Sequence, residues 1–276
     1  MPEPTKSADT IVIDALAAAL RERGAGAAIR GDLARFYAAH GLSGAALEAM
    51  VERGPERLRM YRTMVQSRLR RVIREFLPRT IARRGDARYR EDFALWFEEA
   101  GSHSVILRDV PVEFLTWARP RWEADPAVPA YVLDLARHEL LSVEVRNATG
   151  GREPATGEPL ALDKPLLFDG TARLARYDHA VHRLPLDEAD LSAAAAEPSA
   201  LLAYRDRDNY RVRYIELTPR ASEVMDRLIA GETVVAALQE GAAAAGIALD
   251  DDLLAGMTHL FADLSERGVI LGAPAA

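Results

Sequence analysis

Cysteine is absent from this sequence of 276 residues, and lysine occurs only at Lys6 and Lys164 among 35 basic residues. Without cysteine, the chain can form no disulfide, no thiolate metal site, no iron–sulfur ligation and no cysteine nucleophile. The preference for arginine over lysine is typical of codon bias and does not by itself indicate a binding surface. Acidic residues exceed basic ones, and the formal net charge is −7.

Long apolar runs are also missing. No segment approaches the ~20 apolar residues that a membrane-spanning helix needs. The N-terminus carries Glu3 and Asp9 and lacks the basic region and apolar stretch of a signal peptide. We therefore expect a soluble, cytoplasmic protein with no membrane partner. Hydrophobic residues make up 49% of the chain, which is enough for a proper core.

Catalytic and metal-binding motifs are scarce. No serine lies in a G-x-S-x-G or S-x-x-K context. Asp134 and His138 are four residues apart on a predicted helix and can face one metal ion. No further ligand can be located, so an ordinary polar pair between helices is the favoured interpretation. His179 and His182 are three apart on a predicted strand, which places them on opposite faces. We therefore expect no enzymatic activity from this chain.

Helical periodicity dominates the first half of the chain. Apolar residues recur every three or four positions in seven segments, namely Ile11–Arg23, Ile29–His40, Ser43–Arg53, Pro55–Leu77, Asp86–Ala100, Val110–Trp122 and Pro129–Val145. The last segment is apolar on more than one side, so we expect it to be covered on two sides. These patterns predict a helical extension over residues 1–54 and a helical bundle over 55–147, with aromatic side chains in the core.

Arginine is concentrated on the longest predicted helix and just after it. Residues 55–90 contain twelve arginines and only three acids, Glu56, Glu75 and Asp86. Such a stripe can bind phosphate groups. It can equally be a solvated face whose arginines pair with acids elsewhere in the same protein, and we favour this second interpretation.

The spacing of apolar residues changes from helix-like to strand-like after a turn-rich segment. This segment, residues 148–165, is predicted to be a linker. Beyond it, residues 166–276 contain three predicted strands followed by three helices and a short apolar run. The strands are Ala172–Leu184, Ala200–Asp206 and Tyr210–Leu217, and the helices are Thr218–Ala230, Thr233–Ala245 and Asp250–Arg267, with Val269–Leu271 at the end. Together the two halves predict an α+β protein, mainly α, in which an N-terminal helical bundle precedes a small winged-helix-like domain with a three-stranded antiparallel sheet.

A winged helix usually suggests DNA binding, but the charges here oppose it. The helix in the recognition position, Asp250–Arg267, carries five acids and one arginine. Affinity for nucleic acid comes from neutralised phosphates, so DNA is an unfavourable partner. The arginines of the predicted hairpin are the local exception, and they can equally hold an acidic peptide. They are Arg205, Arg207, Arg211 and Arg213.

The order of these features resembles a bacterial family long labelled as DNA-binding proteins. The resemblance rests on Tyr61-Arg62 through Phe76-Leu77-Pro78, Pro111–Leu115, Pro129–Glu139, Arg173–Asp178 and the hairpin followed by Leu217-Thr218-Pro219. Members of this family act as partner subunits of multinuclear non-heme iron-dependent oxidative enzymes, including the partner in methanobactin biosynthesis. The resemblance is one of pattern over residues 57–272, and residues 1–54 lie outside it.

The resemblance implies a non-catalytic role. The helical domain, residues 55–147, would dock on the iron enzyme, and the winged-helix-like domain would capture the leader of a ribosomally synthesised precursor peptide. The iron would be held by the partner enzyme, with no cofactor in this chain. The runner-up interpretation is a winged-helix transcriptional regulator that uses Pro55–Leu77 and the hairpin arginines on DNA.

Recognition modules of this kind take the leader as an added strand, because an edge strand offers unpaired amides and carbonyls. With strands ordered as in the sequence, Tyr210–Leu217 is the edge, and Asp250–Arg267 lies beside it. We predict that a peptide-binding groove is lined by Tyr210, Val212, Tyr214, Leu253, Met257 and Leu260. Arg211 and Arg213 would meet acidic residues of the leader. Alternatively, the apolar members of this set are simply the core of the small domain.

Overall fold

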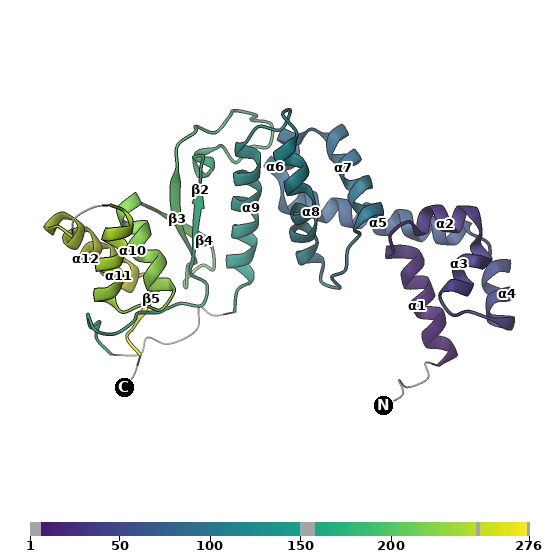
Figure 1. Cartoon of the computed structure of the whole chain (residues 1–276), viewed down its shortest axis with the longest axis horizontal. Helices are drawn as coiled ribbons and strands as arrows, with labels where there is room; N and C mark the ends of the chain where they lie inside the picture. Colours follow the sequence, from purple (N-terminus) through teal and green to yellow (C-terminus); the bar gives the residue numbers. More distant parts are fainter. Residues whose placement is uncertain (1–6, 150–157, 247–248, 275–276) are drawn as a thin grey trace. The chain divides into compact units, whose positions relative to one another are not determined.

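Figure 1 shows the computed structural model of the chain, which describes residues 7–149, 158–246 and 249–274. Contacts divide the chain into two compact units. The helical unit comprises Met1–Leu133 and Asp187–Leu191, and the sheet unit comprises Asp134–Leu186 and Ser192–Ala276. This division falls inside a helix. The domain boundaries expected from the sequence stay predictions, and residues 150–157 of the expected linker lie outside the described residues.

Four short helices open the helical unit. They are α1 (Ala8–Arg21), α2 (Ala25–Gly31), α3 (Leu33–Ala39) and α4 (Gly44–Glu52). Ser7 caps α1 and Asp32 caps α3, each by accepting a hydrogen bond from an amide of the first turn. Ala15, Phe36 and Tyr37 are buried in a core that Leu58 of the next helix also joins. The first four helices therefore share one hydrophobic core with the start of α5.

Aromatic side chains form the centre of the remaining helical unit. Its helices are α5 (Glu56–Phe76), α6 (Pro78–Arg84), α7 (Asp86–Glu99), the short 3₁₀ helix η1 (Leu107–Asp109) and α8 (Val110–Ala124). Trp96 is fully buried, and its ring centroid lies 5.6 Å from that of Phe93 and 5.7 Å from that of Phe114. The predicted aromatic core is thus confirmed.

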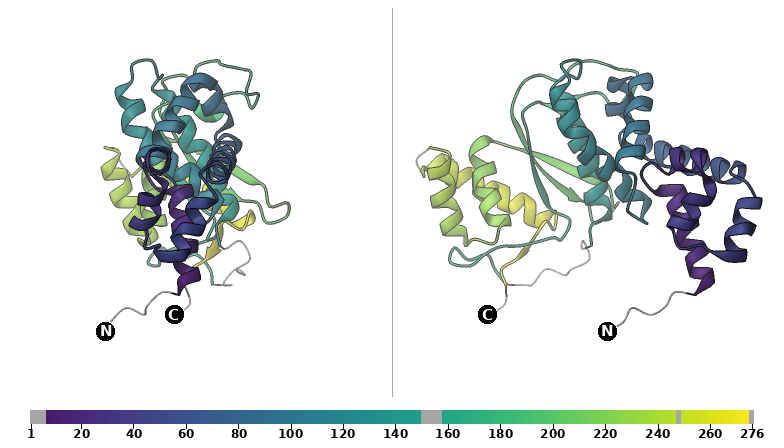
Figure 2. Two further views of the ribbon diagram at one scale, coloured as in Figure 1. Left: turned by 90° about the vertical axis from the view of Figure 1, so that its right-hand side faces the viewer. Right: turned by 45° about the vertical axis from the view of Figure 1, so that its right-hand side comes forward.

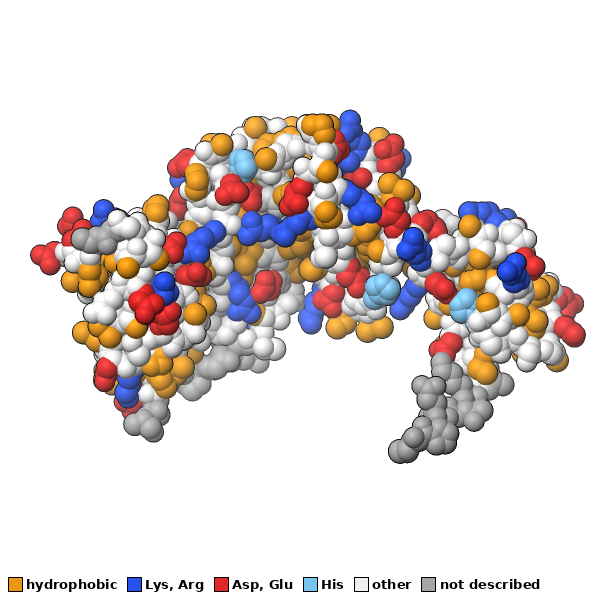
Figure 3. Space-filling view, in the orientation of Figure 1, with side chains coloured by type: hydrophobic (Ala, Val, Ile, Leu, Met, Phe, Trp, Pro, Cys, Tyr) orange, Lys and Arg blue, Asp and Glu red, His pale blue; other side chains and the backbone are white. Residues whose placement is uncertain are grey.

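Most arginines of residues 55–90 form ion pairs with acids of the same unit. Arg62 reaches Glu98 at 2.8 Å, and Arg84 holds Asp92 through two hydrogen bonds of 2.7 and 3.2 Å. Further pairs involve Arg59, Arg71, Arg74, Arg88 and Arg90. Basic and acidic side chains are intermixed over much of the surface in Figure 3. These pairs favour the interpretation of a solvated, internally neutralised face.

Helix α9 (Tyr131–Asn147) covers one face of a sheet. Leu141 and Val145 pack with Ala203 of the sheet, and the helix buries Leu135 and Ala136 completely. Arg205 donates hydrogen bonds to the carbonyls of Arg146 and Ala148 at the end of the helix. The helix expected over Pro129–Val145 is confirmed.

The sheet is antiparallel, with strands in the order β2 (Arg173–Tyr177), β3 (Ser199–Arg205) and β4 (Val212–Leu217). The predicted three-stranded sheet and the mainly helical fold are therefore confirmed. Figure 2 shows α9 on one face of the sheet. On the other face lie α10 (Pro219–Ile229), α11 (Val234–Ala244) and α12 (Asp251–Glu266), capped by Thr218, Thr233 and Asp250. A separate pair, β1 (Leu167–Phe168) and β5 (Ile270–Gly272), includes the strand-like run near the end of the chain.

Two of the predicted strands are shorter than expected. The first ends at Tyr177, so His179 follows the strand and His182 lies in the 3₁₀ helix η2 (Val181–Arg183). The third begins at Val212, which leaves Tyr210 in the hairpin loop. That loop is closed by the carboxylate of Asp206, which accepts hydrogen bonds from the amides of the next polar residues. The third strand therefore begins later than periodicity alone predicts, because the side chain of Asp206 holds the residues before that strand in a turn.

Candidate functional site

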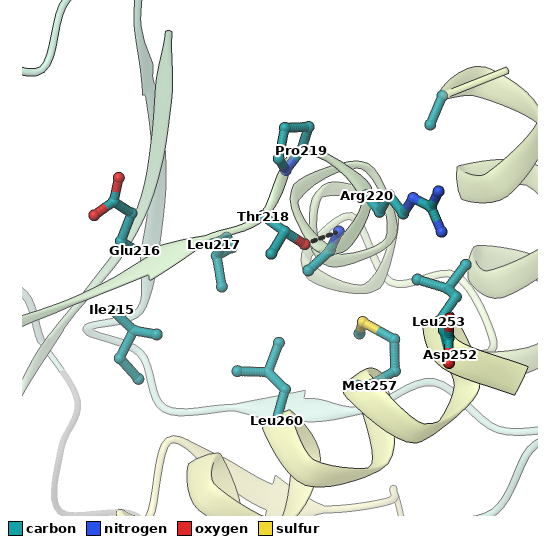
Figure 4. A pocket seen from close by; sticks show the side chains of 13 residues that line it. Ile215, Glu216, Leu217, Thr218, Pro219, Arg220, Asp252, Leu253, Met257 and Leu260 are labelled. Atoms are coloured by element: carbon teal, nitrogen blue, oxygen red, sulfur yellow. Dashed lines mark hydrogen bonds between the residues drawn. The ribbon is translucent and has the colours of Figure 1, made fainter. Parts of the chain in front are cut away.

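An apolar cavity of about 650 Å³ lies between β4 and α12. Figure 4 shows its lining from close by, with side chains from the end of β4 facing side chains from α12. The apolar members are Ile215, Leu217, Leu253, Met257 and Leu260. Met257 and Leu253 are nearly fully buried, whereas Ile215 and Leu260 are only half-buried. The cavity therefore extends from the surface into the hydrophobic core.

Strand β4 is an edge of the sheet. Within the described part of the chain it pairs only with β3, for example through Leu202 opposite Ile215. An edge strand carries amides and carbonyls that no neighbouring strand satisfies. The cavity lies directly beside this edge, because Ile215 and Leu217 belong to both. An extended peptide that paired with β4 would place alternate side chains toward the cavity.

Polar groups surround the cavity. Thr218 accepts a hydrogen bond from the amide of Ala221 at 3.2 Å and so fixes the turn from β4 into α10. Arg220 pairs with Asp250 at 3.3 Å, and Asp252 is exposed at the start of α12. Both an acidic and a basic group therefore flank the opening, which suits a peptide more than a single charged metabolite.

Glu216 points away from the cavity, between Ile215 and Leu217 (Figure 4). Its carboxylate accepts a hydrogen bond from Arg183 at 2.8 Å and lies 3.2 Å from Nε2 of His182. Burial raises the pKa of the Glu216 carboxyl, but these partners outweigh it and hold the pKa below its usual value. Glu216 thus ties the edge strand to η2 and does not contribute a free charge to the cavity.

The structure brings together only part of the predicted groove. Leu253, Met257 and Leu260 line the cavity as predicted, but Val212 and Tyr214 lie on the opposite face of the sheet. The ring of Tyr214 packs against His138 of α9, with centroids 4.9 Å apart. The predicted grouping is corrected by one position along the strand. Since successive side chains alternate between faces, Ile215 and Leu217 replace Val212 and Tyr214 as the strand's contribution.

The remaining predicted residues lie in or near the hairpin. Tyr210 is 56% exposed and adopts a left-handed backbone with φ of 58°. Arg213 pairs with Asp206 at 3.3 Å, and Arg211 makes no side-chain ion pair within residues 158–246. Arg207 lies 3.5 Å from the buried carboxylate of Asp169. Peptide binding by Tyr210, Arg211 and Arg213, and by the rest of the predicted set, stays a prediction.

Residues 170–265 match the family model of the HvfC C-terminal domain.

This HvfC-like region covers about a third of the chain. It includes all three strands of the sheet and α12 up to Ser265, so it contains both the edge strand and the cavity. HvfC is a partner protein in a multinuclear non-heme iron oxidative system, and the match is consistent with an accessory role. No curated protein matches the chain.

No metal centre is evident at the HvfC-like region or elsewhere in the described residues, where no three His, Asp or Glu side chains converge. Asp134 accepts hydrogen bonds from the amide of Asp178 at 3.0 Å and from Nδ1 of His179 at 2.8 Å. The ring of His138 packs edge-on against Tyr177, with centroids 5.6 Å apart, and tilted against Tyr214, with centroids 4.9 Å apart. The two residues instead fasten α9 to the sheet. In the described segments no helix is long and apolar enough to cross a membrane.

Proposed function

We propose that this protein is a non-catalytic partner subunit. It binds the leader of a ribosomally synthesised precursor peptide and presents the peptide to a multinuclear non-heme iron oxidative enzyme, which modifies it. The HvfC-like region supports the accessory role. The iron and the redox chemistry belong to the partner enzyme, and this chain supplies affinity and position.

One observation carries the peptide-binding part of the proposal. The free edge of β4 borders an apolar cavity of about 650 Å³. Backbone hydrogen bonds along the edge give affinity for any extended peptide, and a side-chain pocket beside the edge gives selectivity. The leader residues that enter the cavity should be apolar, because Leu253, Met257 and Leu260 line it.

The charges of α12 disfavour the alternative of a winged-helix regulator. Asp251 and Asp252 are exposed in its first turn, and its last turn contains no basic residue. A phosphate backbone placed along this helix would be repelled. Four of the seven arginines of α5 have an acidic partner in the described residues, so only part of its positive charge is available to neutralise phosphates.

The test is a titration of the full chain into a fluorescently labelled candidate precursor peptide, followed by anisotropy. Binding should survive an increase from about 50 to about 200 mM salt, over which a DNA complex that neutralises several phosphates weakens steeply. Leu260→Asp should weaken binding, because it places a charge at the apolar wall of the cavity. Unchanged binding by a folded Leu260→Asp protein would remove the cavity from the proposal.

A further inference from the structure

Helix α5 has a second face that its packing does not explain. One face is buried, with Leu58, Leu69, Val72 and Ile73 turned into the core. Another set of side chains recurs every three or four positions on the exposed side, and so lies along one line of the helix. We call this set the docking stripe, and it consists of Arg57, Met60, Tyr61, Met64, Arg68 and Arg71.

The apolar members of the docking stripe are large and open to solvent. Met60 is 52% exposed, Tyr61 49% and Met64 59%. Single exposed apolar residues are ordinary on protein surfaces. Three on one line of a helix, interleaved with arginine, match the composition of interface centres, where methionine, tyrosine and arginine are enriched. Methionine side chains are also flexible enough to adapt to a partner's surface.

Much of the positive charge on the stripe has no acidic partner in the described part of the helical unit. Arg57 and Arg68 make no ion pair in the described part of that unit, and Arg71 reaches Glu75 only at 3.7 Å. These guanidinium groups contrast with the other arginines of α5 to α7, most of which have acidic partners at 2.6 to 3.6 Å. The stripe therefore has room for external carboxylates.

A small basic pocket of about 210 Å³ continues the stripe at its C-terminal end. Asp86 is the single acid among its lining residues, and it is already shared by Arg74 at 2.6 Å and Arg90 at 2.8 Å. Arg70 and Arg71 also line the pocket, so its charge remains positive. Guanidinium groups bind carboxylates through paired, directional hydrogen bonds.

We propose that the docking stripe is the surface on which the partner protein binds, and that this partner presents an apolar patch bordered by aspartate or glutamate side chains. The inference rests on the proposed function, and it assigns the binding of the partner enzyme to this surface of α5. Met60 and Met64 supply the buried contact, and Arg57, Arg68 and Arg71 pair with the bordering carboxylates. The basic pocket receives one further acidic side chain.

Nucleic acid fits this surface less well than an acidic protein. A phosphate backbone gains nothing from Met60, Tyr61 and Met64, which are the exposed apolar members of the stripe. A chain with a formal charge of −7 also gains little general attraction to a polyanion. A partner surface that carries both apolar side chains and carboxylates can contact both kinds of group on the stripe, and a phosphate backbone cannot.

The first test measures the dissociation constant between the full chain and the iron enzyme that is recovered with it. Met60→Asp/Met64→Asp should weaken the complex by about 100-fold, as expected for central interface residues. Leu95→Asp is the matched control, because Leu95 is 52% exposed on α7 of the same unit and lies outside the stripe. It should leave the complex unchanged. Arg57→Glu/Arg68→Glu should weaken the complex and reduce its dependence on salt.

The second test needs no substitution in the stripe. Peroxide oxidises exposed methionines, so Met60 and Met64 should react in the free chain, whereas Met225 and Met257, at 0% and 2% exposure, should be protected. The bound enzyme should slow oxidation of Met60 and Met64 specifically. Equal oxidation rates in the free and bound chain would overturn the inference.

These outcomes are separable from failure of the proposed function. If the stripe variants bind the enzyme as tightly as the natural chain, the docking surface is wrong, while the partner role stands. If no iron enzyme binds the natural chain at all, both are wrong. The stripe variants should also bind precursor peptide normally, because the cavity lies on β4 and α12 in the other unit.

Discussion

Gly256 offers a way to close the cavity without disturbing the fold. It lies in α12, lines the cavity, and a Cβ atom built on it meets no other atom within 4 Å. Glycine within a helix costs about 0.5–1 kcal/mol relative to alanine. Gly256→Ala should therefore stabilise the protein by this amount. The unfolding entropy of a unit of about 140 residues is about 0.3 kcal/mol/K, so its Tm should rise by about 2–3 °C.

Gly256→Phe should fill part of the cavity with an aromatic ring. Phenylalanine is a better helix former than glycine by a few tenths of a kcal/mol, so the variant should be at least as stable as the natural chain. The ring would displace one apolar side chain of the peptide, whose burial contributes about 1.5–3 kcal/mol. Peptide affinity should therefore fall by about 10- to 150-fold.

The assay pairs thermal unfolding, followed by circular dichroism, with the anisotropy titration of labelled precursor peptide. Gly256→Ala is the matched control, because it changes the same backbone position and leaves the cavity open. We expect Gly256→Ala to bind normally and Gly256→Phe to bind poorly while both remain folded. Normal binding by a stable Gly256→Phe protein would refute the assignment of the cavity as the peptide site.

Three further predictions concern other parts of the chain. Tyr210→Asn should raise the free energy of unfolding by about 1 kcal/mol, because asparagine tolerates the left-handed backbone at φ of 58° better than tyrosine; a lower Tm would contradict this. Asp92→Ala should lower the free energy of unfolding by about 3–5 kcal/mol, because it removes an acceptor from the largely buried guanidinium of Arg84 and from the indole N–H of Trp122; a loss below about 1 kcal/mol in denaturant unfolding would contradict this and would show that Asp125, 3.1 Å from Arg84, compensates. Burial lowers the pKa of His40, but its bonds to Phe36 and Glu22 outweigh this and raise the pKa above 6.5. The helices that it joins should therefore be most stable below that pH and lose this contribution as pH rises through the raised pKa; Glu22→Gln should remove most of the shift in an NMR titration.

Much of the fold follows from local patterns. The helix over Pro129–Val145 and the hairpin around Asp206 to Arg211 are set by apolar periodicity and by turn-forming side chains, both readable along the chain. Strand ends were less predictable. Tyr177 ends β2 because the amide of Asp178 turns to the carboxylate of Asp134, a contact between residues 44 positions apart.

The predicted groove residues of α12 line the cavity, whereas Val212 and Tyr214 of β4 lie on the other face of the sheet, and peptide binding by both sets stays a prediction. Leu253, Met257 and Leu260 recur at helical spacing and so point the same way. Strand β4 gives no such guide, because α9 covers one face of the sheet and α10 to α12 cover the other. A strand with both faces covered carries apolar residues in both registers, so alternation cannot reveal which face meets the cavity.

The sequence also could not show which arginines form ion pairs with which acids. Which arginines of α5 are neutralised depends on contacts such as that of Arg62 with Glu98, which folding alone brings together. The excess of arginine was visible in the sequence, but it was not visible which arginines, among them Arg57 and Arg68, lack an acidic partner in the described residues. The docking stripe could therefore be inferred only once these pairs were known.

The partner role is tested most directly by affinity purification of the tagged full chain from its own cells, with mass spectrometry and iron analysis of the proteins that accompany it. We predict recovery of a roughly stoichiometric, iron-containing oxidative enzyme. Recovery of the chain alone, or with material that a nuclease removes, would contradict the partner role and would support the regulator instead.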